Sequence, residues 1–278
     1  MGSYQPQMLT SMNAIKSLGH LAALAVAMVS PLEAQQPAAP DYYQVLHYIK
    51  VPAPNRTEFN QLIKEVSIKT AETRVNSGEI ISWTLLQSVM PAGSEARSDY
   101  LMSTMYAKLP PAPLDHSGNS ALFKKAAIAM SYDEYLAKRD KVSSLVAMEM
   151  WKPMRYVGAP QKGHYLFINQ MKVKNERDYV AFEETVWRPI AEHLVKEGKL
   201  SGWLFATKVL PEGAETLYSA YTADMFPTWE AVFSDRAVNE AFAKVHPGKN
   251  IDETFVGVNE LRSLAVRQLW VVRERVAK

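Results

Sequence analysis

Two polar side chains stand at equivalent points of two otherwise apolar segments. His47 is flanked at alternate positions by Val45 and Ile49, and Asn169 stands between apolar residues in the same way. In an extended strand, alternate residues share one face, so each polar group would sit among apolar neighbours and need a hydrogen-bond partner or a ligand. His47 and Asn169 are therefore candidate catalytic or ligand-binding residues. A hydrogen bond within the core is the alternative for both.

Five aromatic residues are further candidates for contacting a ligand. Tyr100, Tyr218 and Tyr221 carry hydroxyl groups within segments that resemble strands, and Trp83 and Trp203 occupy equivalent positions in two other segments. The alternative for the tyrosines is packing in a β-sheet core with a hydrogen-bonded hydroxyl. For the tryptophans we expect a core position between two sheets, which a role as a ligand platform does not exclude.

Composition excludes several kinds of chemistry. The chain has no cysteine, which rules out disulfides, thiolate metal sites and a cysteine nucleophile. His116 and His164 have no second ligand at metal-binding spacing, and no phosphate loop or nucleophile elbow occurs, so we expect no metal and no cofactor. The net charge is +2 with no basic stripe, which disfavours nucleic acid. Glu183 and Glu184 are interpreted as part of a solvated helix face.

The segments that contain these candidate residues belong to a sequence pattern that occurs twice in the chain. Residues 77–93 return as residues 197–213, and Trp83 and Trp203 mark the offset (203 − 83 = 120). A repeat of this period indicates duplication of a whole folding unit rather than a solenoid.

Each copy shows the pattern strand, helix, strand, strand, helix, strand. An asparagine followed by an acidic residue predicts the start of the first helix, at Asn55 and Asn175, and a glycine predicts its end, at Gly78 and Gly198. The other expected elements are strands at 43–51, 99–106 and 145–151, matched by 165–173, 216–223 and 264–272, a tryptophan-bearing second strand in each copy, and helical regions at 121–141 and 229–244.

The first helices of the two copies differ in their apolar stripe. Copy two has Ile190 and Leu194 at helical spacing, whereas copy one has Thr70 and Arg74 at the corresponding positions. This divergence suggests that the two halves have separated in function and that only one of two cavities is functional.

The expected fold class is α+β. A βαββαβ unit forms a ferredoxin-like four-stranded antiparallel sheet with both helices on one face, and two tandem units can cover each other's free face as a fused α+β barrel. The most informative local motif is the segment 187–203, Trp-Arg-Pro-Ile-Ala-Glu-His-Leu-Val-Lys-Glu-Gly-Lys-Leu-Ser-Gly-Trp. With this motif and both repeats, residues 41–272 resemble the dimeric α+β barrel superfamily, which includes antibiotic-biosynthesis-type monooxygenases, NIPSNAP-like and EthD-like proteins.

The resemblance implies two kinds of chemistry. Cofactor-independent oxygenases of the superfamily orient an aromatic substrate and accept a proton from it, which His47, Asn169, Tyr100, Tyr218 and Tyr221 could do. The haem-binding members add a helix-borne histidine to a strand asparagine and a tryptophan. Asn169, Trp229 and His246 could be read that way, but Pro247 and Gly248 break the region, which argues against haem.

The N-terminus predicts export. Lys16 precedes an uncharged apolar stretch, and a small-residue cleavage site follows with its cut after Ala34, as in a secretory signal peptide. The stretch is shorter than the roughly 20 residues of a membrane span. We expect a periplasmic or secreted protein without stable membrane insertion after cleavage. The expected division is a signal peptide at 1–34, a linker at 35–40, repeats at 41–152 and 164–273, a linker at 153–163 and a tail at 274–278.

Two function classes stay open. The first is a barrel that binds a small hydrophobic or aromatic molecule, with a purely structural barrel as its limiting case. The second is a cofactor-independent monooxygenase or isomerase that acts on an aromatic or polyketide-like substrate in the same cavity. Fold alone does not choose between them. We expect a monomeric pseudo-dimer, and a higher oligomer is not excluded.

Overall fold

The computed structural model describes residues 41–94 and 96–278. The expected signal peptide and the linker after it lie outside the described residues. Within the described ranges, no helix is long and apolar enough to cross a membrane.

The two repeats have the expected order of elements. The first contains β1 (Tyr43–Lys50), α1 (Arg56–Leu62), η2 (Ile63–Ser67), α2 (Ile68–Asn76), β2 (Ser82–Met90), β3 (Tyr100–Tyr106), α3 (His116–Lys125), α4 (Tyr132–Val142) and β4 (Ser144–Gly158). The second contains β5 (Tyr165–Val173), α5 (Glu176–Phe182), η3 (Glu183–Trp187), α6 (Arg188–Lys196), β6 (Gly202–Leu210), β7 (Ala220–Phe226), α7 (Trp229–Phe233), α8 (Val238–Val245), α9 (Ile251–Val256), α10 (Val258–Leu261) and β8 (Arg262–Ala277).

The predicted ends of the first helices are confirmed. Gly78 and Gly198 have φ angles of 76° and 71°, the left-handed conformation that glycine adopts most readily after a helix. At the start of α5, the Asn175 side chain accepts a hydrogen bond from the backbone N–H of Asp178 at 3.2 Å. Asn55 does not cap in this way. Its amide instead donates to the carbonyl of Lys141 at 3.1 Å and so ties α1 to the end of α4.

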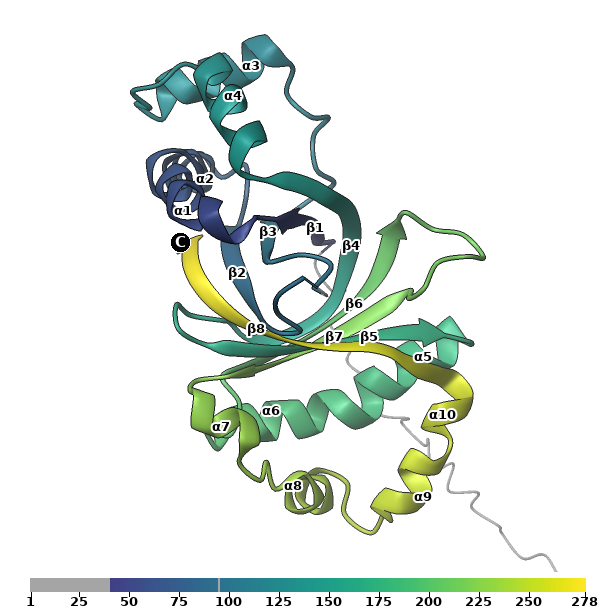
Figure 1. Ribbon diagram of the computed structural model, residues 1–278. Helices are drawn as coiled ribbons and strands as arrows, with labels where there is room; N and C mark the ends of the chain where they lie inside the picture. Colours follow the sequence, from purple (N-terminus) through teal and green to yellow (C-terminus); the bar gives the residue numbers. More distant parts are fainter. Residues whose placement is uncertain (1–40, 95) are drawn as a thin grey trace, which may run out of the picture. The chain divides into compact units, whose positions relative to one another are not determined.

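Eight antiparallel strands close into one barrel in the order β1-β3-β2-β8-β5-β7-β6-β4. The long strands β4 and β8 join the two sheets, because each pairs with its own repeat along one part and with the other repeat along the rest. Figure 1 shows α1–α4 over the outer face of the first sheet and α5–α10 over the outer face of the second. The predicted fused α+β barrel is confirmed.

Side chains from the inner faces of both sheets form a core within the barrel lumen. Trp151 and Trp270, from the last strand of each repeat, are completely buried there among leucines and tyrosines. Trp83 and Trp203 do not lie between the sheets, so that expectation is wrong. They lie on the outer faces, where they pack under the helices of their own repeats.

Three strands differ in their bounds from the sequence-based expectation, and the expected helical regions 121–141 and 229–244 are each divided, into α3 and α4 and into α7 and α8. β4 continues to Gly158, so strand occupies much of the segment expected to be a linker, because residues 152–158 pair with β6. β8 likewise extends to Ala277 by pairing with β2. β7 begins at Ala220, later than expected, which leaves Tyr218 just before the strand.

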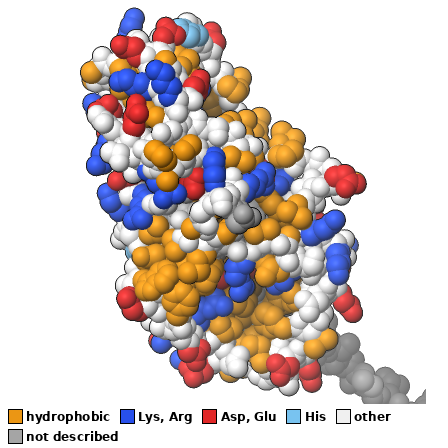
Figure 2. Space-filling model, in the orientation of Figure 1, with side chains coloured by type: hydrophobic (Ala, Val, Ile, Leu, Met, Phe, Trp, Pro, Cys, Tyr) orange, Lys and Arg blue, Asp and Glu red, His pale blue; other side chains and the backbone are white. Residues whose placement is uncertain are grey.

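Side chains of different kinds are interspersed on the surface. On the face drawn in Figure 2, apolar side chains gather in patches, and lysine, arginine and acidic side chains lie between and around them.

Candidate functional site

A cavity of about 720 Å³ lies between the outer face of the first sheet and the helices of the first repeat. Strands β1, β2 and β3 form its floor, and α1, η2, α2, α3 and α4 form its walls and roof. The lining residues combine aromatic, aliphatic and polar side chains. They include His47, Phe59, Ile63, Thr70, Arg74, Trp83, Met102, Thr104, Phe123, Tyr132, Tyr135 and Arg139. This size and mixture are typical of small-molecule sites.

The difference in the helical stripes explains why space exists here. Ile190 and Leu194 of the second repeat are 0% and 1% exposed, and they fill the layer between helix and sheet. Their counterparts Thr70 and Arg74 line the cavity instead. The guanidinium group of Arg74 is fixed by two contacts: it lies 2.8 Å from the Glu79 carboxylate and donates a hydrogen bond to the Tyr106 hydroxyl at 3.0 Å. The divergence seen in the sequence therefore coincides with a cavity in one repeat.

His47 projects from β1 into this cavity. Burial, together with the nearby positive charge of Arg74, lowers the pKa of His47 below its ordinary value. The ring is thus neutral at neutral pH, with one nitrogen as a donor and the other as an acceptor. Within the described residues the structure gives it no hydrogen bond, so a ligand in the cavity would find both functions available.

Aromatic rings supply part of the apolar surface of the cavity. Phe123 of α3 contacts Tyr132 and Tyr135 of α4 with ring centroids 5.3 and 5.4 Å apart. Trp83 of β2 lies on the opposite side, in the floor. Flat rings on both sides of a cavity favour a planar aromatic ligand, because contacts between aromatic rings are more stabilising than the burial of their area alone.

Tyr100 lies in the same layer but does not line the cavity. Its ring packs on Phe59 at 4.6 Å, and its hydroxyl is 3.5 Å from Asn60 Oδ1. It therefore belongs to the core of the first repeat.

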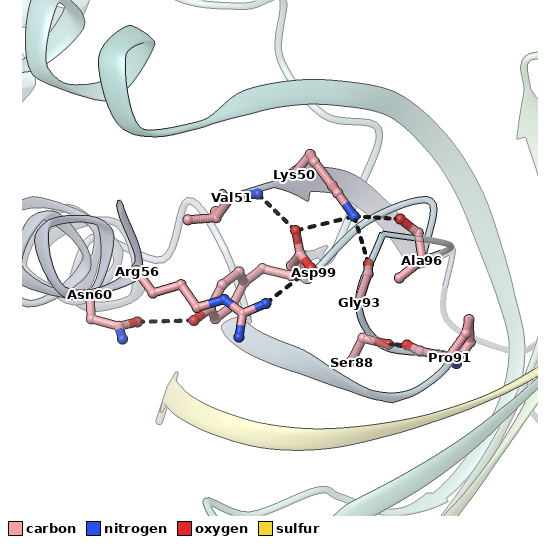
Figure 3. Close-up of polar contacts among 10 residues, drawn as sticks. Lys50, Val51, Arg56, Asn60, Ser88, Pro91, Gly93, Ala96 and Asp99 are labelled. Atoms are coloured by element: carbon pink, nitrogen blue, oxygen red, sulfur yellow. Dashed lines mark hydrogen bonds and ion pairs between the residues drawn. The ribbon is translucent and has the colours of Figure 1, made fainter. Parts of the chain in front are cut away.

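Asp99, which precedes Tyr100, organises the end of β1 (Figure 3). Its carboxylate accepts a hydrogen bond from the Val51 N–H at 2.9 Å and lies 3.6 Å from Lys50 and 3.5 Å from Arg56. Lys50 also donates to the Ala96 carbonyl at 2.6 Å, so it binds the β2–β3 loop rather than extending freely into solvent. This cluster is structural, since all of its charges are paired.

Asn169 occupies the equivalent place in the second repeat and does not line the first-repeat cavity. Its amide donates to Thr222 at 3.2 Å and to Asp224 at 3.5 Å, and its oxygen accepts from Arg267 at 2.6 Å. Asn169 is therefore satisfied within the fold and lies on the opposite repeat from His47.

Two buried carboxylates stand near Asn169. Glu183 is only 5% exposed, so the interpretation of Glu183 as a solvated helix residue is wrong: η3 turns it towards the sheet. Burial raises the pKa of Glu183 to about 7, although Tyr179 and Arg262 lower it in part. Burial also raises the pKa of Asp224, despite the pairing with Arg236 at 3.1 Å. Glu184 is half-buried and pairs with Arg155 at 2.9 Å.

The tryptophan and the histidine considered for haem binding, Trp229 and His246, each have packing or hydrogen-bond partners within the fold. Trp229 is partly exposed and packs on Tyr165 and Phe233. His246 is buried, and its Nε2 lies 2.9 Å from the Val186 carbonyl in η3, which accounts for it structurally. Trp203 is completely buried under α6. Among the residues that the structure describes, no group of three or more histidine and acidic side chains could hold a metal ion.

Tyr218 and Tyr221 lie inside the barrel, on the other side of the sheet from His47. Tyr218 donates to Glu149 at 2.9 Å, and Lys208 approaches the same carboxylate at 3.1 Å. The Tyr221 hydroxyl donates to Gln44. The seven candidates therefore divide among the first-repeat cavity (His47, Trp83), its adjoining core (Tyr100), the second repeat (Asn169, Trp203) and the lumen (Tyr218, Tyr221).

Four polar residues of these sites, Glu149, Lys208, Thr222 and Asp224, were not predicted from the sequence. Asp224 and Thr222 alternate on the strand face that also holds Asn169, so a period-two pattern of polar residues was available as a signal. The Glu149–Lys208 pair carried no such signal, because its members come from β4 and β6 and meet only through the junction between the two repeats.

Comparison with known proteins supports the fold. No family model matches the sequence, and no curated protein matches it. A protein from Lactobacillus acidophilus described as a candidate monooxygenase is 10% identical with a TM-score of 0.52, over 86% of this chain and 97% of that one. A candidate monooxygenase from Fusobacterium nucleatum is 9% identical with a TM-score of 0.51, over 86% and 95%. At such low identity the likeness shows the fold alone, and the chain has the dimeric α+β-barrel fold with both ferredoxin-like halves in one polypeptide.

Proposed function

We propose that the protein binds a small aromatic molecule bearing a hydroxyl or carbonyl group in the cavity of its first repeat. The observation that carries this proposal is the cavity lined by Thr70 and Arg74 at the positions where the second repeat has the buried Ile190 and Leu194. The neutral His47 lies in the floor of this cavity. Trp83, Phe123 and Tyr135 provide surfaces for a planar ring. His47 provides a donor and an acceptor for its polar group.

The proposal is tested by rebuilding the second repeat's packing in the first. In the triple variant Thr70→Ile, Arg74→Leu and Tyr106→Phe, side chains equivalent to Ile190, Leu194 and Phe226 should fill the cavity without orphaning the Tyr106 hydroxyl. We expect affinity for 1-naphthol, measured by isothermal titration calorimetry and thermal shift, to fall at least about tenfold, roughly 1.4 kcal/mol, while the fold is retained.

Two further variants sharpen this test. Thr73→Ile changes the same helix away from the cavity and should leave 1-naphthol binding unchanged. His47→Asn imitates the second repeat and should fold normally but bind 1-naphthol more weakly. Equal affinity in the wild type and the triple variant would place any bound aromatic molecule elsewhere and refute the proposal.

A second candidate function is cofactor-independent oxygenation or isomerisation, as suggested by the monooxygenase descriptions of the proteins that share the fold. The neutral His47 favours it, because such an imidazole can accept a proton from a bound phenol or activated carbon. Isomerisation returns that proton to another atom of the substrate, whereas oxygenation also requires O₂ as the oxidant. For a ligand that is turned over, His47→Asn should lower kcat more than it changes KM.

We also propose that the protein is exported, on the strength of the charged, apolar and small-residue regions that end at Ala34. The mature chain should begin at Gln35. Intact-mass measurement of protein recovered from the periplasm or medium checks this start, and a full-length product confined to the cytoplasm would contradict it.

A further inference from the structure

A second cavity, of about 140 Å³, lies within the barrel on the inner faces of the sheets. It is separate from the first-repeat cavity, which lies on the outer face. Its wall is largely apolar, with Leu86, Leu101, Leu166, Leu204, Ala223 and Met225 drawn from both repeats. An apolar cavity of about 150 Å³ is large enough to hold benzene, so this one could hold a single ring or a chain of about six carbons.

Among residues 41–94 and 96–278, Arg275 is the one cationic residue that lines this apolar space. Arg275 of β8 lines the cavity and donates from one guanidinium nitrogen to the Thr84 hydroxyl at 3.1 Å. Burial lowers the pKa of Arg275, and no carboxylate of residues 41–94 or 96–278 lies within ion-pair distance of it. Its neighbours differ: Glu274 pairs with Lys162, and Arg273 donates to Gln87 on the exposed side.

A half-buried guanidinium that makes one neutral hydrogen bond has most of its five N–H donors left for another group. A carboxylate matches its geometry and charge, and the pair is strengthened where water is partly excluded. The other polar residues that line the cavity are uncharged: Tyr42, Gln44, Ser82, Ser103, Tyr156 and Tyr221, besides Thr84. Gln44 and Ser103 already bond each other at 2.7 Å, and Tyr221 bonds Gln44.

We propose that the barrel lumen binds a small carboxylate with an apolar body, its carboxylate on Arg275 and Thr84 and its body against the lumen leucines. This site is independent of the function proposed for the first-repeat cavity. The ligand class is that of a monocyclic aromatic acid or a short fatty acid, whose apolar body matches the cavity volume.

The probe pair for the test is benzoate and its neutral analogue benzamide, titrated into the full chain by calorimetry and by protein NMR. We expect benzoate to bind the wild type at least about tenfold more tightly than benzamide, and Arg275→Gln to abolish this preference. Arg273→Gln removes a charge from the same strand without facing the cavity and should leave benzoate binding unchanged.

Additional variants separate this site from the first. Ala223→Leu should block both probes by filling the lumen, with folding checked by circular dichroism, while 1-naphthol binding to the first-repeat cavity persists. His47→Asn should not affect benzoate. The proposal is overturned if benzoate and benzamide bind equally, if neither binds at millimolar concentration, or if Arg275→Gln folds normally and retains the wild-type preference for benzoate.

Discussion

Replacing Trp151 by alanine is expected to lower the free energy of unfolding by about 3–5 kcal/mol, the range for removing a large buried aromatic side chain. Trp151 is completely buried in the lumen, 4.8 Å from the Tyr221 ring and 6.1 Å from the Tyr218 ring between centroids. Its indole N–H donates to Glu149 at 3.2 Å, so its loss also weakens the surroundings of the buried Glu149–Lys208 pair. Urea denaturation followed by circular dichroism measures the effect.

Two other tryptophans serve as controls for this prediction. Trp83→Ala should cost less, because Trp83 borders an existing cavity and has fewer partners to lose, although it is 94% buried by area. Trp229→Ala should cost least, since Trp229 is 38% exposed. If Trp83→Ala destabilised the protein as much as Trp151→Ala, the distinction between the packed surroundings of Trp151 and the cavity beside Trp83 would be wrong.

Replacing Glu183 by glutamine is expected to stabilise the protein at pH 8 and to have little effect at pH 4. Because the pKa of Glu183 rises from 4.5 to about 7 on folding, the native state binds the proton more tightly than the unfolded state. The associated stability is complete below pH 4.5 and is lost as the pH rises to about 7. The rise corresponds to roughly 3 kcal/mol at most, which the wild type forfeits above pH 7 and the uncharged glutamine does not.

The measurement is the difference in unfolding free energy between wild type and variant at several pH values from 4 to 8.5. Subtracting the two curves cancels the titration of groups that both proteins share. Glu176→Gln, at an exposed position in the first turn of α5, should give a difference that does not grow across the same interval. A Glu183→Gln difference that is flat from pH 4 to 8.5 would show that the pKa of Glu183 is the same in the native and unfolded states, which contradicts a raised pKa.

The sequence alone determined the elements and their pairing into two units. Strand alternation, asparagines at helix starts and terminal glycines depend on neighbours a few residues away. The bounds of β1 and β5, the starts of α1 and α5 and the ends of α2 and α6 were therefore predicted near their observed positions. The 120-residue repeat then implied two sheets with one free apolar face each, and hence the barrel. The exchange of Ile190 and Leu194 for Thr70 and Arg74 was likewise readable, because equivalent positions in a repeat can be compared directly.

Only the tertiary structure decided which face of each strand meets which layer. An alternating strand has two faces, and a sequence in which both are apolar does not say which one turns to the lumen. The tryptophans of β4 and β8 therefore fill the barrel while those of β2 and β6 lie under the helices. Contacts between the repeats, such as Glu149 with Lys208 and Arg275 with Thr84, arise from the register of long strands across the junctions, which no local pattern encodes.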